Sequence, residues 1–208
     1  MVGDSWLENA KSNLLPKSKE KNNFRKAKLE WQYVGLEDNQ VSDYTCQLCT
    51  HEKIRYEYTI KNKINANTLV VGSSCILQFI KTLADTNDYL TDQHGQVIDQ
   101  KRLEEDKRKY WKSTLLKCLH SKFSNNGFQK SITSLIEDDK KLTIKQAVCM
   151  MEFYNSLEEE EKIAYCNVVQ IKLRKIEQKE QYNALSPEKQ KFITTIATPS
   201  QKKILENL

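Results

Sequence analysis

The sequence has little of what most enzyme active sites need. It contains only three histidines, so a general acid–base constellation has few residues to draw on. It also lacks a glycine-rich phosphate loop, a nucleophile elbow and a zinc-peptidase helix motif. Its acidic clusters, at 104–106, 137–139 and 158–161, are runs of consecutive residues, which spread around a helix surface instead of converging on an ion. We therefore expect a protein that is not an enzyme.

Long apolar runs are absent as well. No stretch approaches the roughly 18 apolar residues of a membrane span. The first 23 residues lack the apolar core and small-residue cleavage site of a secretory signal. Six cysteines without such a signal are typical of a reducing compartment. We expect a cytoplasmic protein that does not enter the membrane.

Glycine and proline are scarce, at 5 and 3 residues, whereas lysine and asparagine are abundant. This usage is typical of an AT-rich genome, for instance that of a low-GC bacterium or of its phages and plasmids. The formal net charge of +5 permits nucleic-acid binding without requiring it.

Three cysteines in the first half of the chain have the spacing of metal ligands. Cys46 and Cys49 form a C-x-x-C pair, which can bind one ion from a tight turn. Cys75 lies where a helix is expected to begin, and a helix N-terminus favours the thiolate form of a cysteine.

The sequence between these cysteines predicts a hairpin followed by a helix. Residues 53–60 alternate between apolar and polar side chains, which indicates a half-buried strand. An asparagine-rich turn over 62–67 leads to a returning strand over 68–71. A helix over 74–83 follows, with apolar residues along one face. The hairpin would return the chain, and with it Cys75, to the C-x-x-C turn.

This order of turn, hairpin and cysteine-bearing helix resembles a treble-clef zinc finger over residues 44–82. The resemblance implies a structural zinc ion with four ligands. The usual fourth ligand sits three residues after the first helical cysteine, where this sequence has Gln78. The nearest substitute is His51, and His94 and His120 are further candidates. The expected ligand set is Cys46, Cys49, His51 and Cys75.

Two other uses of a C-x-x-C pair fit the sequence less well. A redox pair opens a helix after a strand, whereas this pair precedes a strand. A disulfide is disfavoured by the expected compartment. Zinc is therefore the expected cofactor.

The second half of the chain is predicted to be helical, because it contains four sequence patterns that are typical of helix N-termini. Two sequences have the pattern of a capping box, and two place proline after an N-cap residue. These are Thr143–Gln146, Ser156–Glu159, Ser186-Pro187 and Thr198-Pro199. The remaining cysteines, Cys118, Cys149 and Cys166, lie on apolar stripes and are expected in the core.

These patterns predict an α+β fold in which a small zinc-stabilised hairpin and helix domain, similar to a treble clef, precedes an all-α domain. The expected segments are a basic helical segment over 1–30, a zinc-finger-like domain over 31–84, a linker over 85–100 and a helical domain over 101–208.

Basic residues near the finger suggest a nucleic-acid partner, with DNA favoured over RNA. Their role would be sequence-independent contact with phosphates. The candidates are Lys53, Arg55, Lys61, Lys63, Lys101, Arg102, Lys107, Arg108, Lys109 and Lys112. The chain is also similar to small accessory proteins carried by phages and mobile elements. The alternative is a protein that binds and inhibits or modulates a nucleic-acid enzyme, as a host-takeover or anti-defence factor.

Overall fold

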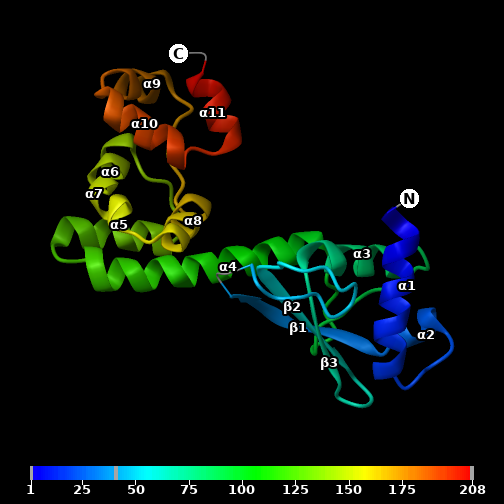
Figure 1. Ribbon diagram of the computed structural model, residues 1–208. Coiled ribbons are helices and arrows are strands. Elements are labelled where there is room, and N and C mark those ends of the chain that lie inside the picture. Colours follow the sequence, from blue (N-terminus) through cyan, green and yellow to red (C-terminus); the bar gives the residue numbers. More distant parts are fainter. Residues whose placement is uncertain (1, 40–41, 207–208) are drawn as a thin grey trace. The chain divides into compact units, whose positions relative to one another are not determined.

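The computed structural model describes residues 2–39 and 42–206, and the chain divides into two compact units. Unit 1 is Met1–Lys107 and unit 2 is Arg108–Leu208. Each unit has its own hydrophobic core. Unit 1 contains a three-stranded antiparallel sheet and unit 2 is built from helices (Figure 1), so the predicted α+β class is confirmed.

Unit 1 begins with helices and continues into the sheet. Its elements are α1 (Val2–Leu14), the 3-10 helix η1 (Leu15–Lys17), α2 (Phe24–Lys28), β1 (Trp31–Asp38), β2 (Tyr56–Asn62), β3 (Thr68–Val71) and α3 (Ser73–Ala84). Helix α4 (Gln100–Cys118) contributes its first residues to unit 1 and the rest to unit 2. The segment over 85–100, which the sequence predicts to be a linker, carries Leu90 and Ile98 in the core of unit 1.

The sheet has the strand order β1-β2-β3. Strand β1 continues past Gly35 to Asp38. A bulge between Tyr33 and Gly35 shifts the register, and pairing then resumes. The buried carboxylate of Asp38 is stabilised in the strand by Arg55, which donates two hydrogen bonds to it, at 2.8 and 2.9 Å.

Aromatic side chains form much of the core of unit 1. Trp31, Tyr33 and Tyr58 are almost fully buried, and α3 packs Phe79 against them. Tyr44 is the exception, with 47% of its surface exposed. Most of the aromatic residues in and beside the predicted finger therefore stabilise the fold.

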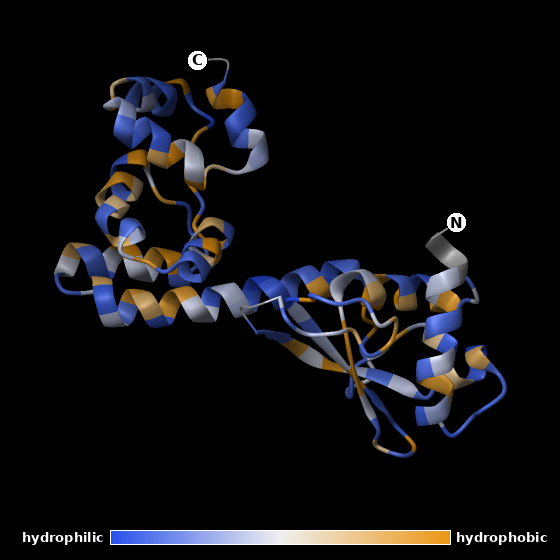
Figure 2. Ribbon diagram, viewed as in Figure 1, coloured by the Kyte–Doolittle hydropathy of each residue, from blue (hydrophilic) through white to orange (hydrophobic). Residues whose placement is uncertain are grey.

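Unit 2 is a set of mostly short helices around one core. They are the π-helix η2 (Leu119–Phe123), α5 (Gly127–Glu137), α6 (Ile144–Cys149), α7 (Met151–Asn155), α8 (Glu159–Val168), α9 (Ile176–Asn183), α10 (Pro187–Ile196) and α11 (Pro199–Leu205). Figure 2 shows apolar and polar residues interspersed along these helices, as expected when one face is buried. Over 2–39 and 42–206, no helix is both long and apolar enough to cross a membrane.

Three of the four predicted helix starts are confirmed. Thr143 and Thr198 each form a complete capping box, and Ser186 precedes Pro187 at the start of α10. The start predicted at Ser156 is wrong. Ser156 is the C-cap of α7, Leu157 is buried in the core, and Glu158 is the N-cap of α8.

The three cysteines outside the predicted metal site differ in their surroundings. Cys118 is buried and Cys166 is half-buried, which agrees with a core position. Cys149 is exposed, so its predicted place in the core is wrong. The reason is that α6 ends at Cys149, which faces away from the buried neighbours Ala147 and Met150.

Gly72 is the residue on which the turn from β3 to α3 depends. A Cβ atom at this position would lie 2.8 Å from Cγ2 of Ile54, a buried, β-branched side chain with little freedom to move. We expect Gly72→Ala to lower the free energy of unfolding by about 1–3 kcal/mol, as overpacking does. Urea denaturation measures this change.

Gly35→Ala is the matched control, because a Cβ atom there would meet nothing within 4 Å. We expect this variant to unfold at the same urea concentration as the wild type, or higher. Equal stability of the two variants would contradict the packing argument.

Candidate metal centre

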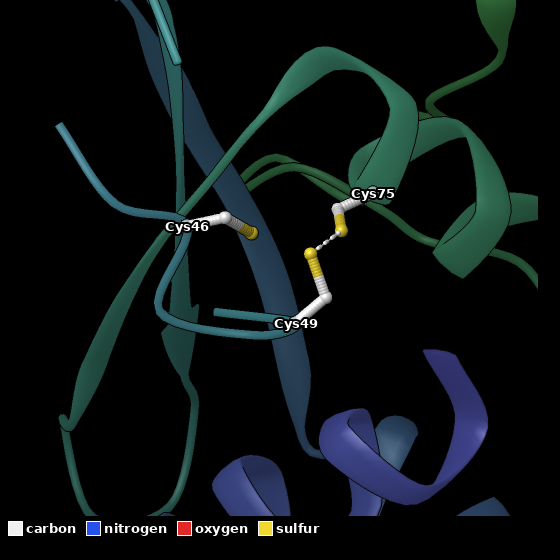
Figure 3. A group of neighbouring side chains, drawn as sticks. All are labelled: Cys46, Cys49 and Cys75. Carbon is white, nitrogen blue, oxygen red and sulfur yellow. Dashed lines mark hydrogen bonds between the residues drawn. The ribbon is translucent and has the colours of Figure 1, made fainter. Parts of the chain in front are cut away.

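Three of the predicted ligands lie together in unit 1. The Sγ atoms of Cys46, Cys49 and Cys75 all lie within 4.8 Å of one another. The Cys75 thiol donates to the sulfur of Cys49 at 2.8 Å, and Figure 3 shows the three side chains pointing toward one another. This is the single cluster of potential metal ligands that the described residues contain.

The C-x-x-C turn is closed by its own backbone. Thr50 N donates to Cys46 O and Cys46 N donates to His51 O, both at 2.8 Å. Thr50 adopts a left-handed conformation, with φ of 63°, which reverses the chain. Leu48, between the two cysteines, is fully buried and anchors the turn in the core.

The same turn is fixed to the sheet by Gln47. Its backbone N–H donates to Val70 O at 2.8 Å, and its side-chain oxygen accepts from Val70 N at 2.9 Å. Strand β3 ends one residue later, and Gly72 N lies 3.4 Å from the Sγ atom of Cys46. Helix α3 then begins and places Cys75 on the opposite side of the cluster.

The surroundings of the cluster favour negative charge on one sulfur. The neighbouring Cys75 thiol lowers the pKa of Cys46 to about 5, and backbone N–H donors from Gly72, Cys49 and Leu48 act in the same direction. The neighbouring sulfur of Cys46 raises the pKa of Cys75, and burial adds to this shift. Burial also raises the pKa of Cys49. The lowered pKa of Cys46 suits a cation site, because metal ligation requires deprotonated sulfur.

The cluster has the dimensions of a metal site. Zinc binds thiolates at about 2.3 Å in a tetrahedron, which separates the sulfurs by about 3.8 Å. The cluster fits such a triangle once the contact between Cys49 and Cys75 opens by about 1 Å. The three cysteines can therefore hold a metal ion. Thiolates select soft ions, including zinc, copper(I) and iron, so geometry alone does not name the metal.

The predicted histidine ligands do not join the cluster. His51 is exposed and contributes its backbone carbonyl to the turn, while its ring nitrogens lie outside the group. His94 is exposed, and His120 pairs with Glu137 in unit 2 at 2.8 Å. The three cysteines line a cavity of about 950 Å³, together with His51 and Gln78. A fourth ligand would approach from this cavity.

Several of the predicted phosphate-binding cations already have partners within the fold. Arg55 is bound to Asp38, whose side chain is 2% exposed. Lys107 lies over the ring of Tyr56, 4.4 Å from its centroid. The other ion pairs are Arg102 with Asp92 and Asp106, Arg108 and Lys112 with Asp139, and Lys101 with Glu105.

The remaining predicted cations are exposed. Lys61 and Lys63 lie at the end of the hairpin formed by β2 and β3, and Lys53 lines the cavity beside the cysteines. Lys109 is also exposed, on α4. The hairpin lysines are therefore the predicted cations best placed to meet a large anionic partner.

Sequence reasoning missed the contribution of helix α1 to the cysteine cluster. Trp6 N–H donates to the Cys75 sulfur at 3.2 Å, and Asn9 and Asn13 donate to backbone carbonyls of the C-x-x-C turn. Their spacing of three and four residues identifies a common helix face. The spacing does not show that this face of α1 packs on the C-x-x-C turn.

No protein-family model, curated protein or solved structure matches this chain.

Removal of one sulfur tests the metal centre. We expect purified protein to contain about one zinc ion per chain, and Cys75→Ser to lose it, because two thiolates hold the ion far more weakly than three. Metal analysis of the purified proteins by mass spectrometry measures this content.

Cys149→Ser is the matched control, since Cys149 is an exposed cysteine in unit 2, outside the cluster. We expect it to retain the wild-type metal content. A full complement of metal in Cys75→Ser would exclude Cys75 as a ligand.

Proposed function

We propose that the chain is a zinc-binding accessory protein that associates with nucleic acid, with DNA favoured over RNA. Zinc would tie the C-x-x-C turn, the β2–β3 hairpin and α3 together as a treble-clef-like finger. The three converging thiols support this role. The lysine- and asparagine-rich composition supports an origin in a phage or mobile element. Cysteines used as ligands suit a reducing cytoplasm.

The observation that carries the nucleic-acid proposal is a group of lysines at the end of the hairpin. We call Lys17, Lys19, Lys61 and Lys63 the hairpin patch. The first two come from the segment after α1, and the last two from the hairpin itself. Side-chain amides of the hairpin, from Asn65 and Asn67, donate to Lys17 O at 2.9 and 2.8 Å. These contacts hold the two chain segments side by side.

Glu30 fixes the same two segments from within. Its buried carboxylate accepts hydrogen bonds from Lys19 N and from the side chain of Asn62, both at 2.7 Å. Its backbone oxygen accepts from Lys63 N at 2.7 Å. Burial opposes ionisation of Glu30, but the hydrogen bonds from Asn62, Lys19 and Glu20 outweigh it and lower its pKa. The carboxylate of Glu30 is thus occupied by internal donors.

The lysine side chains of the hairpin patch are left for an external partner. Among the described residues, none of the four forms an ion pair, and Lys19, Lys61 and Lys63 are exposed. Exposed ammonium groups on a fixed backbone suit repeated phosphates, which they contact without reading sequence. The patch therefore supports backbone binding that is sensitive to salt.

Charge reversal on the hairpin tests this function. We expect Lys61→Glu with Lys63→Glu to weaken binding of a labelled DNA duplex at least about tenfold. The slope of log affinity against log salt should fall by about two, since each phosphate contact contributes about one. Fluorescence anisotropy across a salt series measures both, and a parallel RNA series tests the preference for DNA.

The matched control is Lys189→Glu with Lys191→Glu, which makes the same charge change at exposed lysines of α10 in unit 2. We expect its affinity to stay within about twofold of the wild type. Equal losses in both variants would show that net charge acts in place of the hairpin patch. A wild-type protein that binds no oligonucleotide at low salt would reject the proposal and favour a protein partner.

A further inference from the structure

Helix α1 places three polar side chains on the cysteine cluster and its turn. The indole N–H of Trp6 donates to the Cys75 sulfur at 3.2 Å. The side-chain amides of Asn9 and Asn13 donate to Cys49 O at 3.3 Å and to Leu48 O at 3.1 Å. Residues three and four apart share one helix face, so α1 directs a single face at the cluster.

The sulfurs of Cys46 and Cys75 both accept hydrogen bonds from N–H groups. The sulfur of Cys46 receives backbone N–H donors, of which Gly72 N is one, at 3.4 Å. Cys75 sits in the first turn of α3 and receives its N–H from the side chain of another helix. A metal-bound sulfur carries negative charge, and hydrogen bonds to charged acceptors are about twice as strong as those between neutral groups.

We infer that Trp6 is a positioning residue of the metal centre and that the first turns of α1 are a lid whose docking the metal strengthens, while Ala10 and Leu14 anchor the rest of the helix in the core. The indole holds the Cys75 sulfur in place, while Asn9 and Asn13 hold the turn that carries Cys46 and Cys49. This inference rests on the proposed metal site. Because coupling between two events is reciprocal, docked α1 raises metal affinity and bound metal stabilises the docked helix.

Trp6 also packs against the core of unit 1, so its loss could lower stability without any role at the metal. A readout at the ligand sulfurs separates the two roles. Cobalt(II) in a thiolate site gives a sulfur-to-metal charge-transfer band whose energy follows the electron density on sulfur. Loss of an N–H donor raises that density and moves the band to lower energy, whereas a loss of packing alone does not.

The experiment titrates the full-length protein and Trp6→Phe with cobalt(II) and then with zinc as competitor. We expect Trp6→Phe to bind zinc about tenfold more weakly, as with other groups that support metal ligands, and to move the charge-transfer band to lower energy. A variant with the band and the affinity of the wild type would overturn the role of Trp6.

Trp31→Phe is the matched control. Its indole N–H also donates a buried hydrogen bond, but to Ser18 Oγ at 2.9 Å and not to sulfur. We expect this variant to unfold at a lower denaturant concentration while keeping the cobalt band and the zinc affinity. A shifted band in Trp31→Phe would mean that packing alone moves the band, and would overturn the assignment to Trp6.

Hydrogen exchange of the wild-type protein tests the lid even if Trp6→Phe fails to fold. We expect the amides over 5–14 to exchange more slowly with zinc than after chelation. Equal exchange rates in the two states would overturn the metal-dependent docking of α1. A wild-type protein with no thiolate-to-cobalt band would reject the metal site itself, a result that exchange data alone would not produce.

Discussion

The convergence of three sulfur atoms is the constraint on which the rest of unit 1 depends. Cys46 and Cys75 are almost fully buried, and a buried polar atom without a partner is costly. The neighbouring elements provide these partners. The C-x-x-C turn carries two of the sulfurs, α3 carries the third, and Gly72 after β3 donates its N–H to Cys46. A cation would complete this arrangement, because the remaining sulfur lone pairs then all point to one partner. The hairpin that carries the lysines is thereby fixed at its base.

The three arginines predicted as phosphate contacts all pair with carboxylates, whereas the lysines of the hairpin patch form no ion pair among the described residues. Arg55, Arg102 and Arg108 form ion pairs with carboxylates of their own unit, for which the planar guanidinium is well suited. The hairpin patch consists of lysines, which act as mobile point charges. A lysine surface attracts the repeated phosphates of a nucleic acid without requiring a particular arrangement of hydrogen-bond acceptors. Six of the ten basic residues that sequence position suggests as phosphate contacts, three arginines and three lysines, instead have partners within the fold.

Features encoded by local spacing were predictable, and features that depend on tertiary contact were not. The C-x-x-C turn, the hairpin and Cys75 at a helix start lie within 30 residues, so their convergence follows from the sequence. The extension of β1 to Asp38 depends on Arg55, which lies in a separate segment. The contact of Trp6 with Cys75 spans 69 positions, and no periodicity encodes it. His51 was the nearest histidine in sequence, but the turn uses its carbonyl and leaves its ring exposed.

The segment from α1 to β1 connects the metal centre to the hairpin patch, and its two ends are held by different means. Near its start, Trp6 contacts a ligand sulfur, so this anchor depends on the metal. Near its end, Ser18 accepts a hydrogen bond from Trp31 and donates to Leu14, and Glu30 binds the backbone of Lys19. These contacts involve no sulfur. The patch would therefore keep its backbone fixed even when the first turns of α1 leave the metal centre, which makes metal retention and phosphate binding separable properties of one small domain.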